Sequence, residues 1–216
     1  MESLYDKQHQ CPLCGENFTS KRVKVSKVRV KRIEADFCTY YHGENPNYYS
    51  ILVCPFCGYA YSENSSPVKE GEKEELKKYL EQNPPRADFT APRDYHLAIE
   101  AFQRALEIAR LRKEKPRVLA NYSLHIAWIY RQLEEEEEEK EHSAIALEYF
   151  LEFYEKDSQV DNMGKLMFIM GELNRRLGKE QEAVFWYNRI ISDKKIRDQG
   201  VIRKAREQWQ SMRGYQ

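Results

Sequence analysis

Hydrophobic and polar residues alternate in the first part of the chain. From residue 21 to residue 37, β-branched residues recur among polar ones, at Val23, Val25, Val28, Val30 and Ile33. A spacing of two with β-branched residues is typical of strands. The run 48–53, with sequence YYSILV, predicts a second strand, and the segment HGENPN at 42–47 predicts the turn between them.

A helical spacing of apolar residues replaces this alternation in the second half of the chain. Asp94 is a good N-cap for a helix that continues to Arg112, and Pro116 suits the first position of a helix ending near Leu133. A last helix is expected over about residues 197–213. Three more helices are expected to begin near Ser143, Asp161 and Lys179.

The helices carry a repeated pattern of a small residue, an aromatic four positions later and an apolar residue three positions after that. It occurs at Ala98/Phe102/Ala105, Ala146/Phe150/Phe153 (with Phe at the last position) and Ala183/Tyr187/Ile190. A second helix type places Ala127 three residues before Tyr130, and Gly171 three before Asn174. Such alternation predicts about two and a half tetratricopeptide-like repeats with a final capping helix. In such a repeat, a small residue on the first helix lets the second approach, and an aromatic residue of the second fills the gap. A bundle of unrelated amphipathic helices is the alternative.

The repeat hypothesis predicts a concave groove that takes an extended peptide. With Ala127 aligned to Gly171, the groove is expected to be lined by Asn121, Leu124, Trp128, Arg131, Lys165, Phe168, Glu172 and Arg175. Cations and rings together suit a peptide with acidic groups. The alternative is that Trp128 and Phe168 belong to the core. The run Glu134–Glu139 is expected to lengthen a turn between helices, either as helix extended into solvent or as an attraction for a basic partner.

Together these patterns predict an α+β protein that is mostly α. The expected domains are residues 1–62, a small β domain; 63–93, a proline-containing linker with a short helix at 72–82; and 94–216, the helical repeats.

Composition limits the functional classes. The 216 residues contain 35 Lys and Arg against 35 Asp and Glu, so the whole chain has no diffuse attraction to nucleic acid or anionic membranes. No apolar run is long enough to cross a membrane, and the N-terminal segment MESLYDKQHQ lacks the apolar core of a secretory signal. A cytoplasmic location is therefore expected, where closely spaced cysteines more often bind metal than form disulfides.

Four of the five cysteines form two near-copies of one motif, CPLCG and CPFCG. Each pair, Cys11 with Cys14 and Cys54 with Cys57, has the spacing of a zinc knuckle. Gly15 and Gly58 stand where the knuckle turns back, a position that often needs positive φ. Four thiolates make a closed tetrahedral site with no position for substrate. The sequence therefore predicts one structural zinc ion, with iron of the rubredoxin type as the less favoured metal, in a zinc ribbon whose folding depends on the ion.

Other chemistry-bearing residues leave alternatives open. Cys38, His42 and His9 could bind a second metal, and Cys38 could be a reactive thiol; a buried Cys38 is the simpler interpretation. Lys24, Lys27 and Arg29, near several tyrosines, have the ingredients of a nucleic-acid-binding hairpin. However, residues 1–62 contain eight Lys and Arg against six Asp and Glu, so the local field is weak.

The sequence gives no indication of catalysis. Its glycines form no phosphate-binding loop, and neither H-E-x-x-H nor G-x-S-x-G occurs. His96, His125 and His142 lie in separate helices without a nearby nucleophile.

Three longer segments carry a family resemblance: DFCTYYHGENPNYYSILVCPFCGYA, ADFTAPRDYHLAIEAFQRAL and the closing AREQW. With the first knuckle and the order ribbon, linker, helices, the chain resembles over nearly its full length the bacterial family known as domain of unknown function 2225. The resemblance implies a zinc ribbon joined to tetratricopeptide-like helices, matches the knuckles at Cys11, Cys14, Cys54 and Cys57, and carries over no catalytic residue.

The sequence thus favours a non-enzymatic cytoplasmic adaptor whose helical groove binds a protein or peptide. The alternative is a regulatory nucleic-acid-binding protein that uses the basic hairpin of the ribbon. The partner and the oligomeric state are left open.

Overall fold

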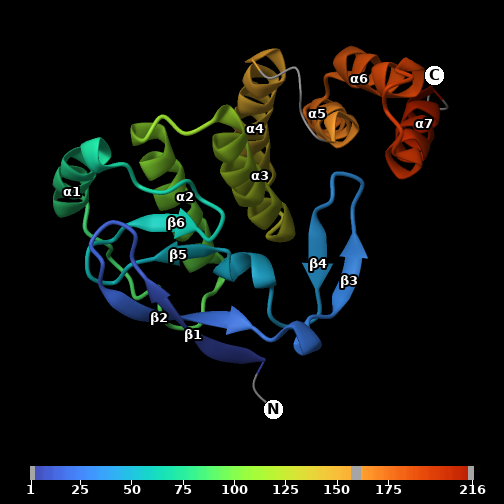
Figure 1. The fold of residues 1–216 in the computed structure, drawn as a ribbon. Helices are drawn as coiled ribbons and strands as arrows, with labels where there is room; N and C mark the ends of the chain where they lie inside the picture. Colours follow the sequence, from blue (N-terminus) through green and yellow to red (C-terminus); the bar gives the residue numbers. More distant parts are fainter. Residues whose placement is uncertain (1–2, 157–161, 214–216) are drawn as a thin grey trace. The chain divides into compact units, whose positions relative to one another are not determined.

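The computed structural model describes residues 3–156 and 162–213, which form two compact units (Figure 1). The ribbon unit comprises Met1–Arg32 and Thr39–Glu114, and the helical unit comprises Ile33–Cys38 and Lys115–Gln216. The division after Glu114 differs from the boundary expected at residue 94, because the helix that follows residue 94 packs against strands of the ribbon unit.

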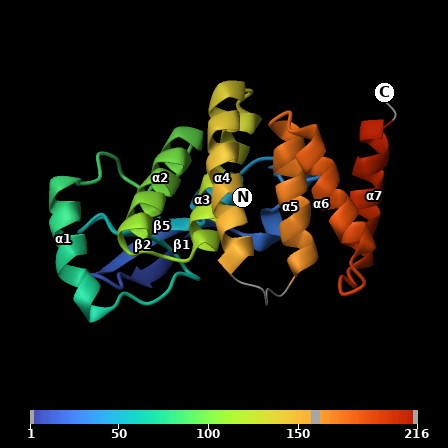
Figure 2. The ribbon, with the colours of Figure 1, turned by 90° about the horizontal axis from the view of Figure 1, so that it is seen from above.

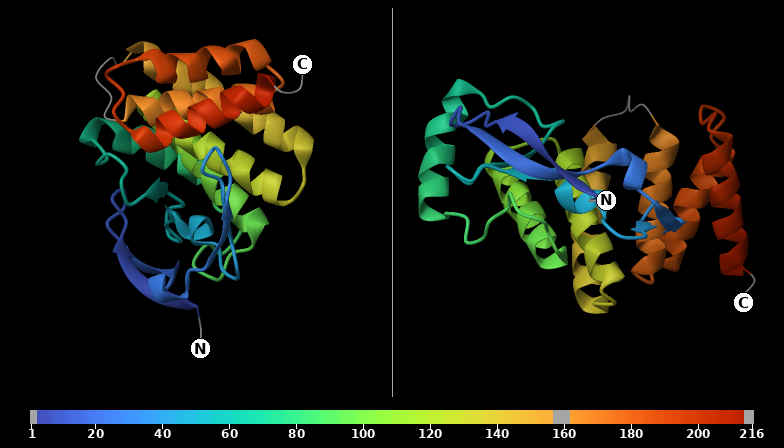
Figure 3. Two further views of the ribbon diagram at one scale, coloured as in Figure 1. Left: turned by 90° about the vertical axis from the view of Figure 1, so that its right-hand side faces the viewer. Right: turned by 90° about the horizontal axis from the view of Figure 1, so that it is seen from below.

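The strands of the N-terminal part pair two by two. Among the residues described, successive strands form three two-stranded sheets, β1–β2, β3–β4 and β5–β6. In the first, seen as a long ribbon in Figure 3, Leu4 pairs with Val23 and Gln10 with Asn17 in antiparallel register. The strands are β1 (Leu4–Gln10), β2 (Asn17–Val23), β3 (Val30–Ile33), β4 (Thr39–Tyr41), β5 (Ile51–Val53) and β6 (Ala60–Ser62).

This arrangement corrects the strand prediction in three places. The strand β1 precedes the first knuckle and was not anticipated, and Val25 lies in a 3₁₀ turn, η1 (Val25–Lys27), with 88% of its surface exposed. Tyr48 and Tyr49 belong to another such turn, η2 (Pro46–Tyr49), so the predicted strand over 48–53 begins only at Ile51. The reason is that each knuckle is the turn of a hairpin, which pairs the strand before it with the strand after it.

Two helices complete the ribbon unit. After the 3₁₀ turn η3 (Glu70–Glu72), α1 (Lys73–Gln82) confirms the short helix expected at 72–82. Helix α2 (Tyr95–Leu111) begins as predicted, because the Asp94 side chain accepts a hydrogen bond of 2.9 Å from the backbone N–H of Leu97. Its alanine-rich face packs against β5, β6 and η2.

Arg93 ties the start of α2 to the second hairpin of the ribbon unit. Its buried guanidinium donates hydrogen bonds to the carbonyl oxygens of Ile51 at 2.7 Å, Phe89 at 2.8 Å and Tyr48 at 3.1 Å. Burial lowers the pKa of Arg93 to about 10. A planar group with five donors can bind carbonyl groups from several segments at once. This one side chain therefore connects the start of α2 to η2, to β5 and to the segment that contains Phe89.

Helices α3 to α7 follow one another in the described part of the helical unit (Figure 2). The expected start at Pro116 is confirmed, whereas the start expected near Ser143 is wrong because the helix begins at Glu136. The start expected near Asp161 falls on a residue outside those described. The helices are α3 (Pro116–Gln132), α4 (Glu136–Lys156), α5 (Met163–Arg176), α6 (Glu180–Ser192) and α7 (Gln199–Arg213).

The turns from α3 to α4 and from α5 to α6 are equivalent. Glu134 and Gly178 both have positive φ, 63° and 73°, and each N–H bonds to the carbonyl three residues earlier, that of Arg131 or Arg175. The turn before α4 is therefore short, contrary to the expectation that the glutamates lengthen it. Residues 136–139 form the first turn of α4 instead, where carboxylates interact favourably with the helix dipole.

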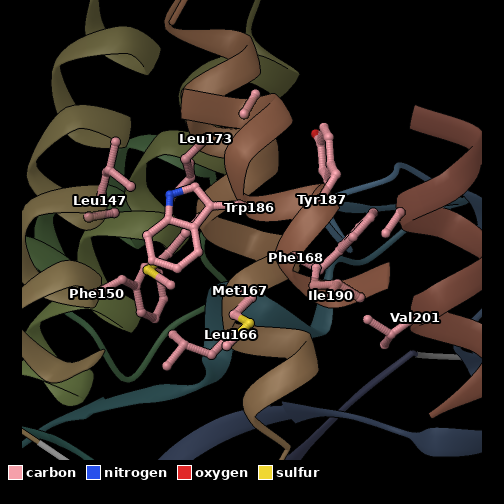
Figure 4. Close-up of a cluster of buried hydrophobic side chains, with 14 of the residues drawn as sticks. Leu147, Phe150, Leu166, Met167, Phe168, Leu173, Trp186, Tyr187, Ile190 and Val201 are labelled. Atoms are coloured by element: carbon pink, nitrogen blue, oxygen red, sulfur yellow. The ribbon is translucent and has the colours of Figure 1, made fainter. Parts of the chain in front are cut away.

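The helices pack through matched small and aromatic residues. A Cβ atom built on Gly171 of α5 would lie only 2.6 Å from the ring of Tyr187 on α6, so only glycine allows this approach. The Tyr187 hydroxyl donates a hydrogen bond of 2.6 Å to the buried Glu172 carboxylate. Figure 4 shows Phe168, Trp186, Ile190 and neighbouring side chains filling the space between the helices.

Within residues 3–156 and 162–213, every helix is too short or too polar to span a lipid bilayer.

Candidate metal centre and acidic loop

Each cysteine pair sits in a tight turn between two paired strands. In the first knuckle the backbone N–H of Gly15 donates to the carbonyl oxygen of Cys11 at 2.9 Å, and in the second that of Gly58 donates to Cys54 at 2.8 Å. The φ angles of the two glycines are +83° and +72°. The sequence-based expectation that these glycines need a left-handed conformation is confirmed.

The two knuckles bring four sulfur atoms together. The Sγ atoms of Cys11 and Cys57 are 3.6 Å apart, those of Cys14 and Cys54 are 3.7 Å apart, and all four lie within 4.8 Å of one another. A tetrahedral zinc ion with sulfurs at about 2.3 Å places its ligands about 3.8 Å apart. The donor set and its spacing therefore fit a metal ion. Four protein ligands complete a tetrahedral shell and leave no position for a substrate.

Crowding perturbs the ionisation of these thiols. The hydrogen bond to Cys54 raises the pKa of Cys11 to about 12, and hydrogen bonds to Cys11 and Cys54 raise that of Cys57. The bond from Cys11 lowers the pKa of Cys54 to about 2. Burial, and then the charges of Cys11 and Cys54, raise the pKa of Tyr61. One thiolate, that of Cys54, is thus stabilised by its neighbours, whereas further negative charge is costly to gather here without a cation.

The second knuckle has an arginine against its backbone. Arg104 of α2 donates from Nε to the carbonyl oxygen of Gly58 at 2.6 Å. A Cβ atom on Gly58 would collide with this guanidinium and lie 2.9 Å from Pro85, whereas a Cβ on Gly15 would meet open space. The two motifs are near-copies in sequence, but the glycine of the second is packed against a side chain of α2, whereas that of the first faces open space.

Cys38 lies apart from the metal centre. It is fully buried in the helical unit, beside the Gln132 amide at 3.7 Å, and burial raises its pKa to about 11. The ring of His9 packs against Phe18. Among the residues described, the four knuckle cysteines are the one group of His, Cys, Asp and Glu with metal-binding spacing, and it includes neither Cys38 nor His42.

A second constellation lies in the helical unit around residues Glu34–Cys38, hereafter the acidic loop. The Glu34 carboxylate contacts Arg131 of α3 at 2.9 Å and Arg176 of α5 at 2.5 Å. The Asp36 carboxylate is completely buried; it contacts Arg131 at 2.8 Å and accepts a hydrogen bond of 3.0 Å from the Trp128 indole. Two carboxylates in alternate positions are thus held by two helices.

Phe37 inserts its ring beside these ion pairs. The ring meets Phe168 edge-on with centroids 6.0 Å apart, and the Lys204 ammonium lies 4.4 Å from its centroid. This geometry combines aromatic packing with a cation–π contact. The acidic loop is therefore bound through the ion pairs of its two carboxylates and through the aromatic contacts of Phe37.

The guanidinium of Arg131 lies at the centre of this site. Besides the acidic loop, it contacts Glu139 in the first turn of α4 at 2.7 Å. Burial acts to lower the pKa of Arg131, but the charges of Asp36 and Glu139 outweigh it, and the net effect raises the pKa. One member of the run Glu134–Glu139 therefore has a defined place in the fold.

The residues expected to line the groove occupy different environments. Trp128 and Arg131 contact the acidic loop. Phe168 and Glu172 are completely buried, and Arg175 pairs with Glu172 at 3.0 Å. Asn121 and Lys165 are exposed. Phe168 and Glu172 therefore offer no free surface, because α6 packs over them through Tyr187.

Sequence reasoning missed Glu34, Asp36 and Arg176. The available signal was the pair of carboxylates beside Phe37, at the end of a segment otherwise rich in Lys and Arg. The cationic residues proposed for nucleic acid, Lys24, Lys27 and Arg29, lie in and beside η1. Lys27 and Arg29 are exposed, and in the described part of the chain none of the three forms an ion pair.

The profile of one protein family matches residues 4–212 of this chain; its description reads "Uncharacterized protein conserved in bacteria (DUF2225)". No curated protein and no solved structure gave a significant match.

Proposed function

The chain belongs to the DUF2225 family, and from this premise we propose that it is a non-enzymatic cytoplasmic adaptor, in which a zinc ribbon is joined to helical repeats that bind a protein or peptide partner. The zinc ion is structural, because Cys11, Cys14, Cys54 and Cys57 fill a tetrahedral shell. Its role is to hold together two hairpins too small to fold alone.

The tetratricopeptide-like interpretation of the helices is supported by their internal equivalence. The α3–α4 and α5–α6 hairpins share the same turn geometry at Glu134 and Gly178. The contact between Gly171 and Tyr187 matches the small residue and aromatic expected on successive helices of such a repeat. Stacked hairpins of this kind commonly present a surface for extended peptides.

The observation that carries the adaptor proposal is the acidic loop. It is an irregular peptide segment, and α3 and α5 hold it with Arg131, Arg176 and Trp128. A helical surface that recognises two carboxylates and a ring in its own chain has the chemistry needed for a partner with similar groups.

The test is capture of partners from the native bacterium with tagged full-length protein. The informative variant combines Asn121→Ala with Lys165→Glu, because both side chains are exposed on the helices expected to line the groove. Lys156→Ala, on the exposed end of α4, is the matched control. We expect a partner that wild type and control recover equally and the double variant loses. Equal recovery by all three proteins would contradict the proposed groove.

A nucleic-acid-binding function is the second candidate, favoured by the unpaired cations around η1. Their binding to DNA or RNA would weaken steeply between about 50 and 200 mM salt, because phosphate contacts release counterions. The triple change Lys24→Ala, Lys27→Ala and Arg29→Ala should then weaken binding. Lys77→Ala with Lys78→Ala, on the exposed face of α1, should not. Salt-independent or absent binding by the wild-type protein would exclude this candidate.

A further inference from the structure

We propose that the acidic loop is an intramolecular ligand, and that a partner segment of the same chemistry replaces it: two carboxylates in alternate positions followed by an aromatic residue. This inference rests on the proposed adaptor function and specifies its partner class and its regulation. The groove would be closed by the protein's own loop until a better ligand competes for it.

The backbone of the acidic loop contains a strained residue at a position where hairpin turns usually have glycine. Glu34 and Cys38 pair through a hydrogen bond of 2.8 Å, and Phe37 bonds back to Glu34 at 3.0 Å, so Ala35, Asp36 and Phe37 form a three-residue turn. The last position of such a turn is left-handed and usually glycine. Here Phe37 takes it, with φ of 70°. Its contacts with Phe168 and Lys204 are what offset this strain.

The carboxylates and the ring of the acidic loop are recognised by groups that converge from separate helices. Trp128 and Arg131 come from α3, Arg176 from α5 and Lys204 from α7. The sequence of the acidic loop therefore defines the pattern expected in a partner. The Glu34 carboxylate contacts the guanidinium groups of Arg131 and Arg176, and the Asp36 carboxylate contacts Arg131 and the Trp128 indole. The Phe37 ring contacts the Phe168 ring and the Lys204 ammonium. A cationic or purely apolar segment would leave these buried donors without acceptors.

The acidic loop does not provide a hydrogen-bond acceptor for every buried donor of the arginines that bind it. A competing ligand that provides these acceptors can therefore bind more tightly than the loop. The buried Nη2 of Arg131 has no hydrogen-bond acceptor in the described part of the chain, and the buried Nε of Arg176 lies 3.7 Å from the Asp36 carboxylate, beyond hydrogen-bond distance. A ligand with one further carboxylate oxygen in reach of these donors gains hydrogen bonds that the acidic loop does not make. Binding of that ligand expels the loop, because both use the same guanidiniums.

A cyclic peptide provides the probe. It carries residues 32–40 with Cys38→Ser, closed by a D-Pro-Gly turn that preserves the hairpin, and its binding to the full-length, zinc-loaded protein is measured by fluorescence anisotropy. We expect the Glu34→Gln, Asp36→Asn protein to bind it at least about tenfold more tightly than wild type, since its own loop competes less. Glu137→Gln with Glu138→Gln, on exposed positions of α4, should bind like wild type.

A second measurement needs no variant. Cys38 is the one cysteine outside the metal centre and is fully buried in the acidic loop. Displacement of the loop by the peptide should expose this thiol and speed its alkylation by at least about tenfold, because burial no longer opposes thiolate formation. A control peptide with Gln and Asn at the two acidic positions should leave the alkylation rate unchanged.

Equal affinity of wild type and the loop variant for the peptide, or absence of binding to both, would overturn the proposal. Should the loop variant fail to fold, Cys38 alkylation in wild type decides, and an unchanged rate at saturating peptide overturns it. These outcomes differ from failure of the adaptor proposal. If a partner is captured through Lys165 but does not compete with the peptide, the adaptor function is supported and the displacement of the acidic loop is contradicted. If the peptide binds as expected but no partner is captured, the displacement of the loop is supported and the adaptor function is contradicted.

Discussion

At the residue scale, position in the fold separates side chains that look alike in the sequence. His125 is one of five histidines, and burial lowers its pKa from 6.5 to about 4, with Trp128 packed edge-on against its ring. The unfolded chain therefore binds a proton between these pH values that the folded protein does not. Stability rises with pH through this window and is lost as the pH falls from 6.5 towards 4.

We expect His125→Asn to reduce this acid sensitivity. Urea unfolding at pH 7.0 and pH 4.5 should show that the wild type loses more free energy of unfolding than the variant. The difference should be at most about 3 kcal/mol, because one pKa unit corresponds to about 1.4 kcal/mol. The same acid loss in both proteins would contradict the assignment of the low pKa to His125.

The two knuckle glycines should respond differently to alanine. In Gly15→Ala the added methyl group lies in open space, so the free energy of unfolding should fall only by the backbone strain, about 1 kcal/mol or slightly more. Gly58→Ala adds a collision with Arg104 and Pro85, so its loss should exceed that of Gly15→Ala by about 1–3 kcal/mol. Thermal unfolding of the metal-loaded proteins compares the two losses. Equal losses would show that Arg104 moves aside freely.

Arg93 should tolerate no replacement, although it forms no salt bridge in the described structure. Arg93→Lys keeps the charge but cannot reach the carbonyl oxygens of Tyr48, Ile51 and Phe89 together. We expect a loss of about 2–4 kcal/mol in urea unfolding, since buried acceptors and a buried charge lose partners. Arg86→Lys, at an exposed position, is the control and should change stability little. A similar effect of the two changes would contradict this role.

At the scale of elements, the equivalent turns of the helical unit suggest a stabilising substitution. Glu134 has a φ of 63° at the position where the second hairpin has Gly178. Glu134→Gly should raise the free energy of unfolding by about 0.5–1 kcal/mol, because glycine adopts this conformation without strain. Gly178→Ala should lower it by a similar amount, since nothing but the backbone opposes the methyl group there. Urea unfolding measures both, and destabilisation by Glu134→Gly would show that its side chain has another role.

At the scale of the whole molecule, the metal centre should stabilise the ribbon unit selectively. Removal of the metal ion by a strong chelator should increase hydrogen exchange in β1, β2, β5 and β6. Exchange in the core of α3 to α6 should change little, since that core contains no metal ligand. Cys14→Ser should lose the metal and Cys38→Ser should keep it, as measured by elemental analysis. A metal-free ribbon unit with unchanged protection would contradict a structural role for the ion.

How much could be predicted from the sequence depends on whether the signal was local. The N-cap at Asp94, the proline at the start of α3 and the positive φ of Gly15 follow from chemistry within a few residues, and the structure confirms them. The strand predicted through Val25 was wrong, and β1 was missed, because strand formation depends on a pairing partner. Ser143 was mistaken for a helix start, since it lies inside α4.

The sequence by itself determined the four cysteines that come together with metal-binding spacing, the helical character of the second half and the small-to-aromatic match of Gly171 with Tyr187, because spacing and residue type suffice for each. Only the tertiary structure decided that α2 belongs with the ribbon unit and that Arg104 braces one knuckle. It also decided that Trp128 and Arg131 already hold an acidic segment about a hundred residues away in the chain. The physical reason is that a buried charge has to find a counter-charge in three dimensions, and no periodicity along a chain records where that partner will be.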